Sequence, residues 1–220
     1  MSSILNIDTA VQTSSVCVAQ NDQPLFEKVN PSPKDSAAWL HVAIEQSLTD
    51  AGIDFHELDA IAVSEGPGSY TGLRVGMAAA KGLCYALNKP LITVNSLKMM
   101  AVAAVGRPAD LLCPMIDARR MEVFTALFDQ QLNFIWQPRN LILNETSFFD
   151  WPQGRSILFF GNGSAKFQPL IKHPNALFDH IEASSRDMVS MAYQKFLQGD
   201  FANLAYSQPF YGKDFYSPTL

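Results

Sequence analysis

The sequence predicts an α/β fold in which a mainly parallel sheet is extended by an antiparallel hairpin. Residues 1–106 alternate short apolar runs with helix-like segments in the order β-β-β-α-β-α-β-α, and such alternation is typical of α/β proteins. The first three runs are separated by short turn signals, as expected for antiparallel strands. Residues 107–220 add further strands and one helix. We therefore expect an N-terminal subdomain over 1–106 and a smaller C-terminal subdomain over 107–220, whose end packs back on the first.

The elements of the first half follow from apolar periodicity bounded by turn residues. Asn21 and Asp22 predict a hairpin turn, and Gly52 predicts the end of the first helix. The expected strands are residues 4–8, 15–19, 24–29, 59–63 and 91–94, and the expected helices are residues 35–51, 70–88 and 96–105.

The second half is less regular. Residues 129–156 are rich in Asn, Gln and Pro and are expected to lack regular structure. No internal repeat is visible in the sequence. The expected strands are residues 111–116, 121–128 and 157–160, and a helix is expected over residues 186–198.

The amino-acid composition and net charge argue against several classes of function. The 220 residues are 48% hydrophobic, so the chain can bury a sizeable core. A formal charge of −5, without a basic run, argues against independent binding to nucleic acid. No signal peptide or membrane-spanning run is visible. Three widely spaced cysteines without a C-x-x-C motif are typical of a reduced, cytoplasmic protein.

A glycine-rich segment over residues 64–76 is the most informative feature, because it reads as a strand, a tight loop and the start of a helix. A helix N-terminus after a glycine turn can bind an anion. Alternatively, the small residues allow close packing of the helix on the sheet. The spacing of Gly66, Gly68 and Gly72 fits neither the P-loop nor the dinucleotide fingerprint, so packing is the favoured interpretation.

Two helices carry side chains typical of interfaces on the face that we expect to point outward. In helix 35–51 the inward face is predicted to hold Leu40, Ile44, Leu48 and Ala51. In helix 70–88 the inward face is predicted to hold Gly72, Gly76, Ala79, Leu83 and Ala86. The alternative is a set of scattered surface aromatics, which is common. The outward residues, and so the predicted partner or dimer interface, are Trp39, Val42, Tyr70, Arg74, Met77, Lys81 and Tyr85.

The sequence motifs do not combine into a catalytic site. The four histidines include no i,i+4 pair for a metal, and neither H-E-x-x-H nor G-x-S-x-G occurs. Asp8 and Thr9 end the first strand and could contact a phosphate or a metal-bound water, or simply cap a turn. Gly161, Gly163 and Ser164 could form an anion-binding nest, or a plain turn. We predict no metal site and no cofactor.

Several segments resemble the TsaB (YeaZ) family, and in order they cover residues 4–163. The most specific is the G-P-G-S-Y-T-G-L-R block within residues 66–74, whereas residues 129–156 match nothing in the family. The other matching segments are Ile7-Asp8-Thr9-Ala10, Asp59-Ala60-Ile61-Ala62-Val63, Ala80-Lys81-Gly82-Leu83, Pro90-Leu91-Ile92-x-Val94-x-Ser96-Leu97, Ile116-Asp117-Ala118-Arg119-Arg120-x-Glu122-Val123 and Gly161-Asn162-Gly163.

The resemblance implies an actin/sugar kinase/Hsp70-like (ASKHA) fold and a role in making threonylcarbamoyladenosine in tRNA. It implies a partnership with the transferase TsaD and the ATPase TsaE, with TsaC supplying the intermediate, and a homodimer when alone. TsaD carries N-H-x-x-x-H where this chain has Ser96 and Met100, which are poor ligands for iron or zinc. We therefore expect a non-catalytic scaffold that meets tRNA only through the complex. The alternatives are a nucleotide-binding ATPase that uses Asp8, Thr9 and 161–164, and a metallopeptidase.

Overall fold

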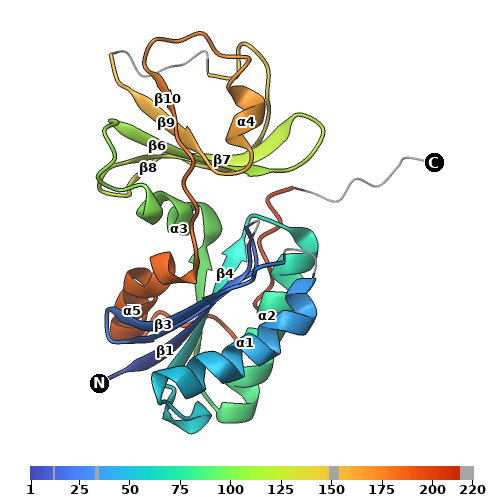
Figure 1. Cartoon of the computed structure of the whole chain (residues 1–220), viewed down its shortest axis with the longest axis vertical. Coiled ribbons are helices and arrows are strands. Elements are labelled where there is room, and N and C mark those ends of the chain that lie inside the picture. The colour runs from blue at the N-terminus through green and yellow to red at the C-terminus, as the bar shows by residue number, and fades with distance from the viewer. Residues whose placement is uncertain (12, 33–34, 149–153, 214–220) are drawn as a thin grey trace, which may run out of the picture.

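The computed structural model of the chain describes residues 1–11, 13–32, 35–148 and 154–213. These residues form two lobes, each built on a five-stranded sheet. Figure 1 shows one lobe above the other, with helix α3 (Ser96–Ala103) between them.

The sheet of the N-terminal lobe has the strand order β3-β2-β1-β4-β5. The central strand β1 pairs in parallel with β4 and antiparallel with β2, which continues into β3. The predicted mixture of a parallel sheet and an antiparallel hairpin is therefore confirmed. The strands are β1 (Ser3–Asp8), β2 (Ser15–Gln20), β3 (Gln23–Val29), β4 (Ala60–Gly66) and β5 (Leu91–Asn95).

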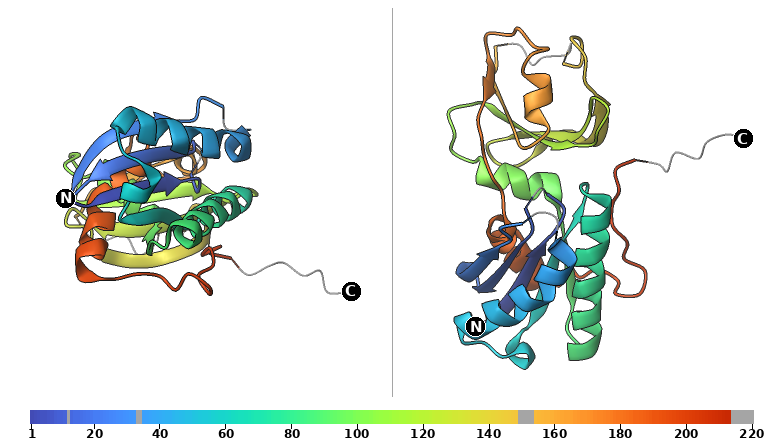
Figure 2. Two further views of the ribbon diagram at one scale, coloured as in Figure 1. Left: turned by 90° about the horizontal axis from the view of Figure 1, so that it is seen from below. Right: turned by 45° about the vertical axis from the view of Figure 1, so that its right-hand side comes forward.

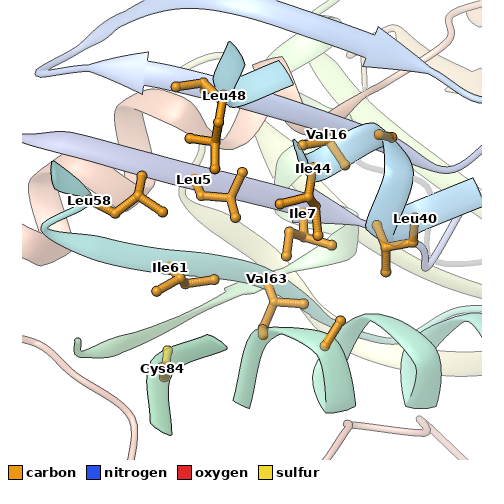
Figure 3. Close-up of a cluster of buried hydrophobic side chains, with 14 of the residues drawn as sticks. Leu5, Ile7, Val16, Leu40, Ile44, Leu48, Leu58, Ile61, Val63 and Cys84 are labelled. Carbon is orange, nitrogen blue, oxygen red and sulfur yellow. The ribbon is translucent and has the colours of Figure 1, made fainter. Parts of the chain in front are cut away.

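Helices cover both faces of this sheet because its central strands are buried on both sides. Helices α1 (Ser36–Ala51) and α2 (Tyr70–Leu87) lie side by side on one face (Figure 2). Leu5 and Ile7 point into the core beneath them (Figure 3), whereas Ile4 joins the core on the opposite face under α5 (Val189–Gln198). This alternation is the two-residue period of a strand. Among the described helices, none is long and apolar enough to cross a membrane.

The C-terminal lobe repeats the topology of the first. Its strand order is β10-β9-β6-β7-β8, in which β6 pairs antiparallel with β7 and in parallel with β9. The repeat is reduced, because the short helix α4 (Ser164–Phe167) is its only described helix. The strands are β6 (Leu111–Asp117), β7 (Glu122–Asp129), β8 (Phe134–Ile142), β9 (Ile157–Phe160) and β10 (Ala176–Phe178).

The expectation that residues 129–156 lack regular structure was wrong, because β8 lies within them; residues 149–153 fall outside the described part. Strand β8 is an edge strand that contains Pro138, and edge strands give weak sequence signals. Its side chains still alternate: Phe134 and Trp136 are half-buried, and Ile135 between them is exposed. The three-residue strand β10 was also missed.

After β10 the chain returns to the N-terminal lobe. A 3₁₀ turn, η3 (Ser185–Met188), leads directly into α5, so the single helix predicted over 186–198 has two parts. Residues 200–213 then run past the outer side of α2, beside the glycine-rich loop.

Candidate functional site

The glycine-rich segment forms the end of β4, a tight loop and the first turns of α2. Ser69 caps the helix, because its Oγ accepts a hydrogen bond from the Gly72 amide at 3.2 Å. The amide of Ser69 itself donates to the Ala10 carbonyl oxygen at 2.8 Å. Strand β1 and helix α2 are thereby joined at their adjacent ends.

The glycines of this segment make room for the protein's own chain. A side chain at Gly68 would overlap the Ala10 carbonyl, and one at Gly72 or Gly76 would overlap Thr9. Thr9 also donates its hydroxyl to the Gly72 carbonyl oxygen at 2.7 Å. The packing interpretation of these glycines therefore agrees with the structure, since the loop faces its own backbone.

The outward faces of α1 and α2 carry large exposed side chains. The exposed fractions are 52% for Val42 on α1 and 83% for Tyr85 on α2. Arg74 is also exposed, and its guanidinium lies 5.4 Å from the centre of the Tyr70 ring while donating to its hydroxyl at 3.2 Å. These four residues point outward as predicted. We call these four residues, together with the exposed small residues Ala78, Gly82 and Ala86 of α2, the α1–α2 face.

Three other predicted interface residues lie differently. Met77 is only 3% exposed and belongs to the core between α2 and the sheet, so its outward assignment was wrong. Trp39 is half-buried against the same core. Lys81 is half-buried and donates to the carbonyl oxygens of Ala205 at 3.2 Å and Ser207 at 3.0 Å.

The physical reason is a small rotation of α2 about its axis. Its buried stripe contains Leu73, Gly76, Met77, Ala80 and Cys84, whereas Ala86, predicted to face inward, is exposed. Glycine and alanine carry little apolar signal, so the sequence pattern fixed the direction of this face only approximately.

The same rotation exposes a row of small residues. Ala78, Gly82 and Ala86 follow each other at intervals of four and are all exposed. A Cβ atom added at Gly82 would meet no atom within 4 Å. The centre of the α1–α2 face is therefore smooth, with Arg74 and Tyr85 beside it.

A cavity of about 640 Å³ lies between the lobes. Its walls include Val11 and Thr13 from the N-terminal lobe, Met100 from α3, and Gly161 and Ser164 from the loop after β9. The acidic side chains that line it are Asp179 and Glu182, and His180 lies between them in the sequence; all three are exposed.

In the loop after β9, the amides of Gly163 and Ser164 are already bonded within the protein. Gly163 donates to the Met115 carbonyl oxygen at 2.9 Å, and Ser164 donates to that of Gly161 at 3.1 Å. The Ser164 hydroxyl also donates to the Gly161 carbonyl oxygen, at 2.8 Å. These hydrogen bonds are those of a plain turn. They agree with that alternative for Gly161, Gly163 and Ser164 better than with an anion-binding nest.

Asp8 and Thr9 are not among the cavity's lining residues. Asp8 is fully buried, and its Oδ1 accepts from the Ser64 hydroxyl at 2.5 Å and the Ala10 amide at 3.0 Å. Burial raises the pKa of its carboxyl to about 6. A nucleotide, the ligand that an ASKHA fold implies, is a poor fit for these residues. The glycine loop is filled by the protein's own backbone, and two exposed carboxylates, Asp179 and Glu182, line the cavity.

Ser96 and Met100 occupy successive turns of α3, and both are buried. Asn95 caps this helix by accepting from the Lys98 amide at 3.1 Å. Within the described part of the chain, no three His, Cys, Asp or Glu side chains gather as a metal site would require.

Comparison with known proteins gives consistent matches. The family model described as "TsaD: tRNA N6-adenosine threonylcarbamoyltransferase" matches residues 30–207. The chain is 31% identical to the tRNA threonylcarbamoyladenosine biosynthesis protein TsaB of Bacillus subtilis, over 77% of this chain and 75% of that protein. It is 28% identical to the TsaB protein of Escherichia coli, over 94% and 93% of the two chains.

Among solved structures, a protein described as having similarity to peptidase YeaZ from Pseudomonas aeruginosa superposes with a TM-score of 0.83. It is 25% identical and covers 97% of this chain and 100% of its own. The predicted α/β fold of two subdomains, with the second one reduced, is confirmed by this likeness and by the two sheets of the structure.

Proposed function

We propose that this chain, which belongs to the TsaB (YeaZ) family, acts in the biosynthesis of threonylcarbamoyladenosine in tRNA as a non-catalytic partner of TsaD. The relatives that carry the TsaB name support the pathway. The α1–α2 face is the observation that carries the partner role, because it exposes interface-type side chains around a smooth centre.

The absence of transferase activity is inferred from α3. The resemblance to TsaD sets Ser96 and Met100 at the positions of its two metal-binding histidines. Neither a hydroxyl nor a thioether is a good ligand for iron or zinc, in contrast to imidazole. Both side chains are buried, Ser96 at the start of α3 and Met100 at the wall of the cavity. We therefore assign the transfer reaction to TsaD and a supporting role to this chain.

The docking role is assigned to the α1–α2 face. Small residues allow two helix backbones to approach closely, and Ala78, Gly82 and Ala86 provide such a row on α2. Tyr85, Tyr70, Arg74 and Val42 surround it with large contact groups, and Tyr and Arg are frequent hot-spot residues. We propose that helices of TsaD pack here and that a second copy of the chain uses the same face when TsaD is absent. Of the other predicted contacts, Trp39 and Lys81 contribute only their exposed edges, and Met77 supports the face from beneath.

Contact with tRNA is proposed to run through the complex. Affinity for tRNA grows with the number of phosphates neutralised by Lys and Arg. With 16 basic and 21 acidic residues, the chain has an excess of negative charge. In this proposal, TsaD and TsaE complete the reaction in the cytoplasm, and TsaC supplies the intermediate.

The proposal is tested by mixing the chain with TsaD of the same cell and following both by size-exclusion chromatography with light scattering. We expect a heteromeric complex that forms at the expense of the chain's own dimer. Two separate peaks at micromolar concentrations would contradict the partner role. Calorimetric titration of the chain with ATP, with and without Mg²⁺, tests the ATPase alternative, and we expect no heat of binding.

A further inference from the structure

We propose that residues 200–213, here called the strap, clamp the two lobes together on the side of α2. The proposal rests on the contacts of the strap alone and is independent of the partner role. Four successive anchors tie the strap to the edge of the N-terminal sheet, to α2, to the glycine-rich loop and finally to the opposite lobe.

The first anchor is on the edge of the N-terminal sheet. The amide of Ala202 donates to the Leu91 carbonyl oxygen at 2.8 Å, and the two residues form an antiparallel bridge beside β5. The strap therefore begins as an extension of the sheet.

The second anchor is Lys81 on α2. Asn203 folds the strap into a turn, because its Oδ1 accepts from the Ala205 amide at 3.0 Å and the Tyr206 amide at 3.1 Å. This turn directs the carbonyl groups of Ala205 and Ser207 at the Lys81 ammonium group, which donates to both. A single lysine thus holds the middle of the strap.

The third anchor is the glycine-rich loop. The Phe210 amide donates to the Glu65 carbonyl oxygen at 2.7 Å, and any side chain at Gly66 would overlap the Phe210 carbonyl. The ring of Tyr211 lies 5.0 Å from that of Tyr70 at the start of α2. Gly66 therefore leaves room for the strap to cross.

The fourth anchor reaches the C-terminal lobe. A Cβ atom at Gly212 would lie 2.9 Å from Pro67 of the loop and 3.0 Å from the Phe124 ring of β7, so Gly212 touches both lobes at once. Its φ of +67° is in the left-handed region that favours glycine. Lys213 then pairs with Glu122, also on β7.

These anchors matter because of where the chain itself crosses between the lobes. Within the described residues it crosses once through α3 and once through the segment between β10 and η3. In Figure 1 both crossings lie near the middle of the molecule, whereas the strap lies beside α2. Two crossings can act as a hinge. A third contact away from them restrains rotation of one lobe against the other.

The test uses the full chain and two strap variants. Lys81→Met removes the second anchor while keeping the length of the side chain, and Gly212→Val fills the space between Pro67 and Phe124. Gly52→Ala is the control for backbone strain, since Gly52 has the same φ of +67° but no atom within 4 Å of an added Cβ. Lys172→Met, at an exposed lysine, is the control for loss of charge. Circular dichroism checks that each variant is folded.

The hydrogen-exchange rate of the Phe210 amide measures how firmly the strap is held. We expect this amide to exchange roughly tenfold faster in both strap variants and unchanged in both controls. Spin labels on exposed cysteines introduced at Glu57 and Glu145, one in each lobe, measure the distance between the lobes; the three native cysteines are buried. We expect a broader distance distribution in the strap variants. Unchanged Phe210 exchange in Lys81→Met, or a freed strap with an unchanged distance distribution, would overturn the proposal.

Discussion

Gly76 of α2 lies directly against Thr9, the residue after β1, so closely that any side chain at position 76 would overlap the threonine hydroxyl. The Thr9 hydroxyl is itself fixed by its hydrogen bond to the Gly72 carbonyl oxygen. The contact sets how closely α2 approaches the sheet, and it therefore positions the α1–α2 face.

A pair of glycine substitutions in α2 separates this packing role from helix propensity. We expect Gly76→Ala to lower the free energy of unfolding by about 1–3 kcal/mol, because the new methyl group overpacks against Thr9. We expect Gly82→Ala to raise it by about 0.5–1 kcal/mol, because Gly82 is in open space and alanine favours a helix. Urea denaturation measures both, and equal effects would contradict the account of Gly76.

Met77 is expected to behave as a core residue. Met77→Ala should lower the free energy of unfolding by about 2–5 kcal/mol through the cavity that it leaves. Met77→Glu should cost more, because a carboxylate would be buried without a partner. The matched change Arg74→Ala, one turn away on the exposed side, should stay within about 0.5 kcal/mol. A Met77→Ala variant as stable as the parent would contradict the burial of this residue.

The buried Asp8 carboxyl predicts a pH dependence of stability. Its pKa in the folded protein is about 6, above the ordinary value of 3.8, because burial disfavours the charged form. The folded state therefore holds the Asp8 proton more tightly, and this contribution to stability falls as the pH rises from about 4 to about 6. The raised pKa of half-buried Asp187 acts in the same direction.

Asp8→Asn isolates the contribution of Asp8, because Asp187 is kept. Relative to the parent, the variant should become progressively more stable between about pH 4 and pH 6, with no further change above. The full pKa difference corresponds to about 3 kcal/mol, which is an upper bound for the change. Denaturant titrations at a series of pH values measure it. A stability difference that is the same at every pH would show that Asp8 does not titrate in this range.

Substitutions on the α1–α2 face should weaken binding to TsaD without weakening the fold. Tyr85→Ala removes the most exposed aromatic side chain of α2, and Gly82→Gln places a long side chain at the centre of the smooth row. We expect each to reduce the affinity for TsaD at least tenfold, about 1.4 kcal/mol. Calorimetric titration gives the affinity, and thermal denaturation checks the fold.

Leu197→Ala is the matched control for this experiment. Leu197 is 59% exposed and lies on α5, on the opposite face of the same sheet. Its substitution should leave the affinity for TsaD unchanged. Wild-type affinity of both face variants, or an equal loss with Leu197→Ala, would mean that TsaD docks elsewhere.

The sequence predicted most of the fold because its strong signals are local. The apolar runs of the N-terminal sheet, the turn at Asn21 and the helix end at Gly52 all have direct physical signatures, and the structure contains each of them. Strands β8 and β10 have weak signatures. The first is an edge strand with a proline and the second has three residues, so both depend on pairing with distant parts of the chain.

The candidate face was predicted in outline but not residue by residue. Tyr85, Arg74, Tyr70 and Val42 were found from residue type and helical period. Met77 was misplaced because the flanking small residues leave the orientation of α2 poorly defined. The role of Lys81 could not be predicted from the sequence, because its partners are backbone carbonyls more than 120 residues away in the sequence.

Reconstitution of the modification tests the central claim most directly. Unmodified tRNA is incubated with TsaC, TsaD and TsaE of the same cell and the small-molecule substrates of TsaC, in the presence and absence of this chain. Nucleoside mass spectrometry then measures threonylcarbamoyladenosine. The account predicts product only when both this chain and TsaD are present. Full modification without this chain, or product formed by this chain without TsaD, would contradict it.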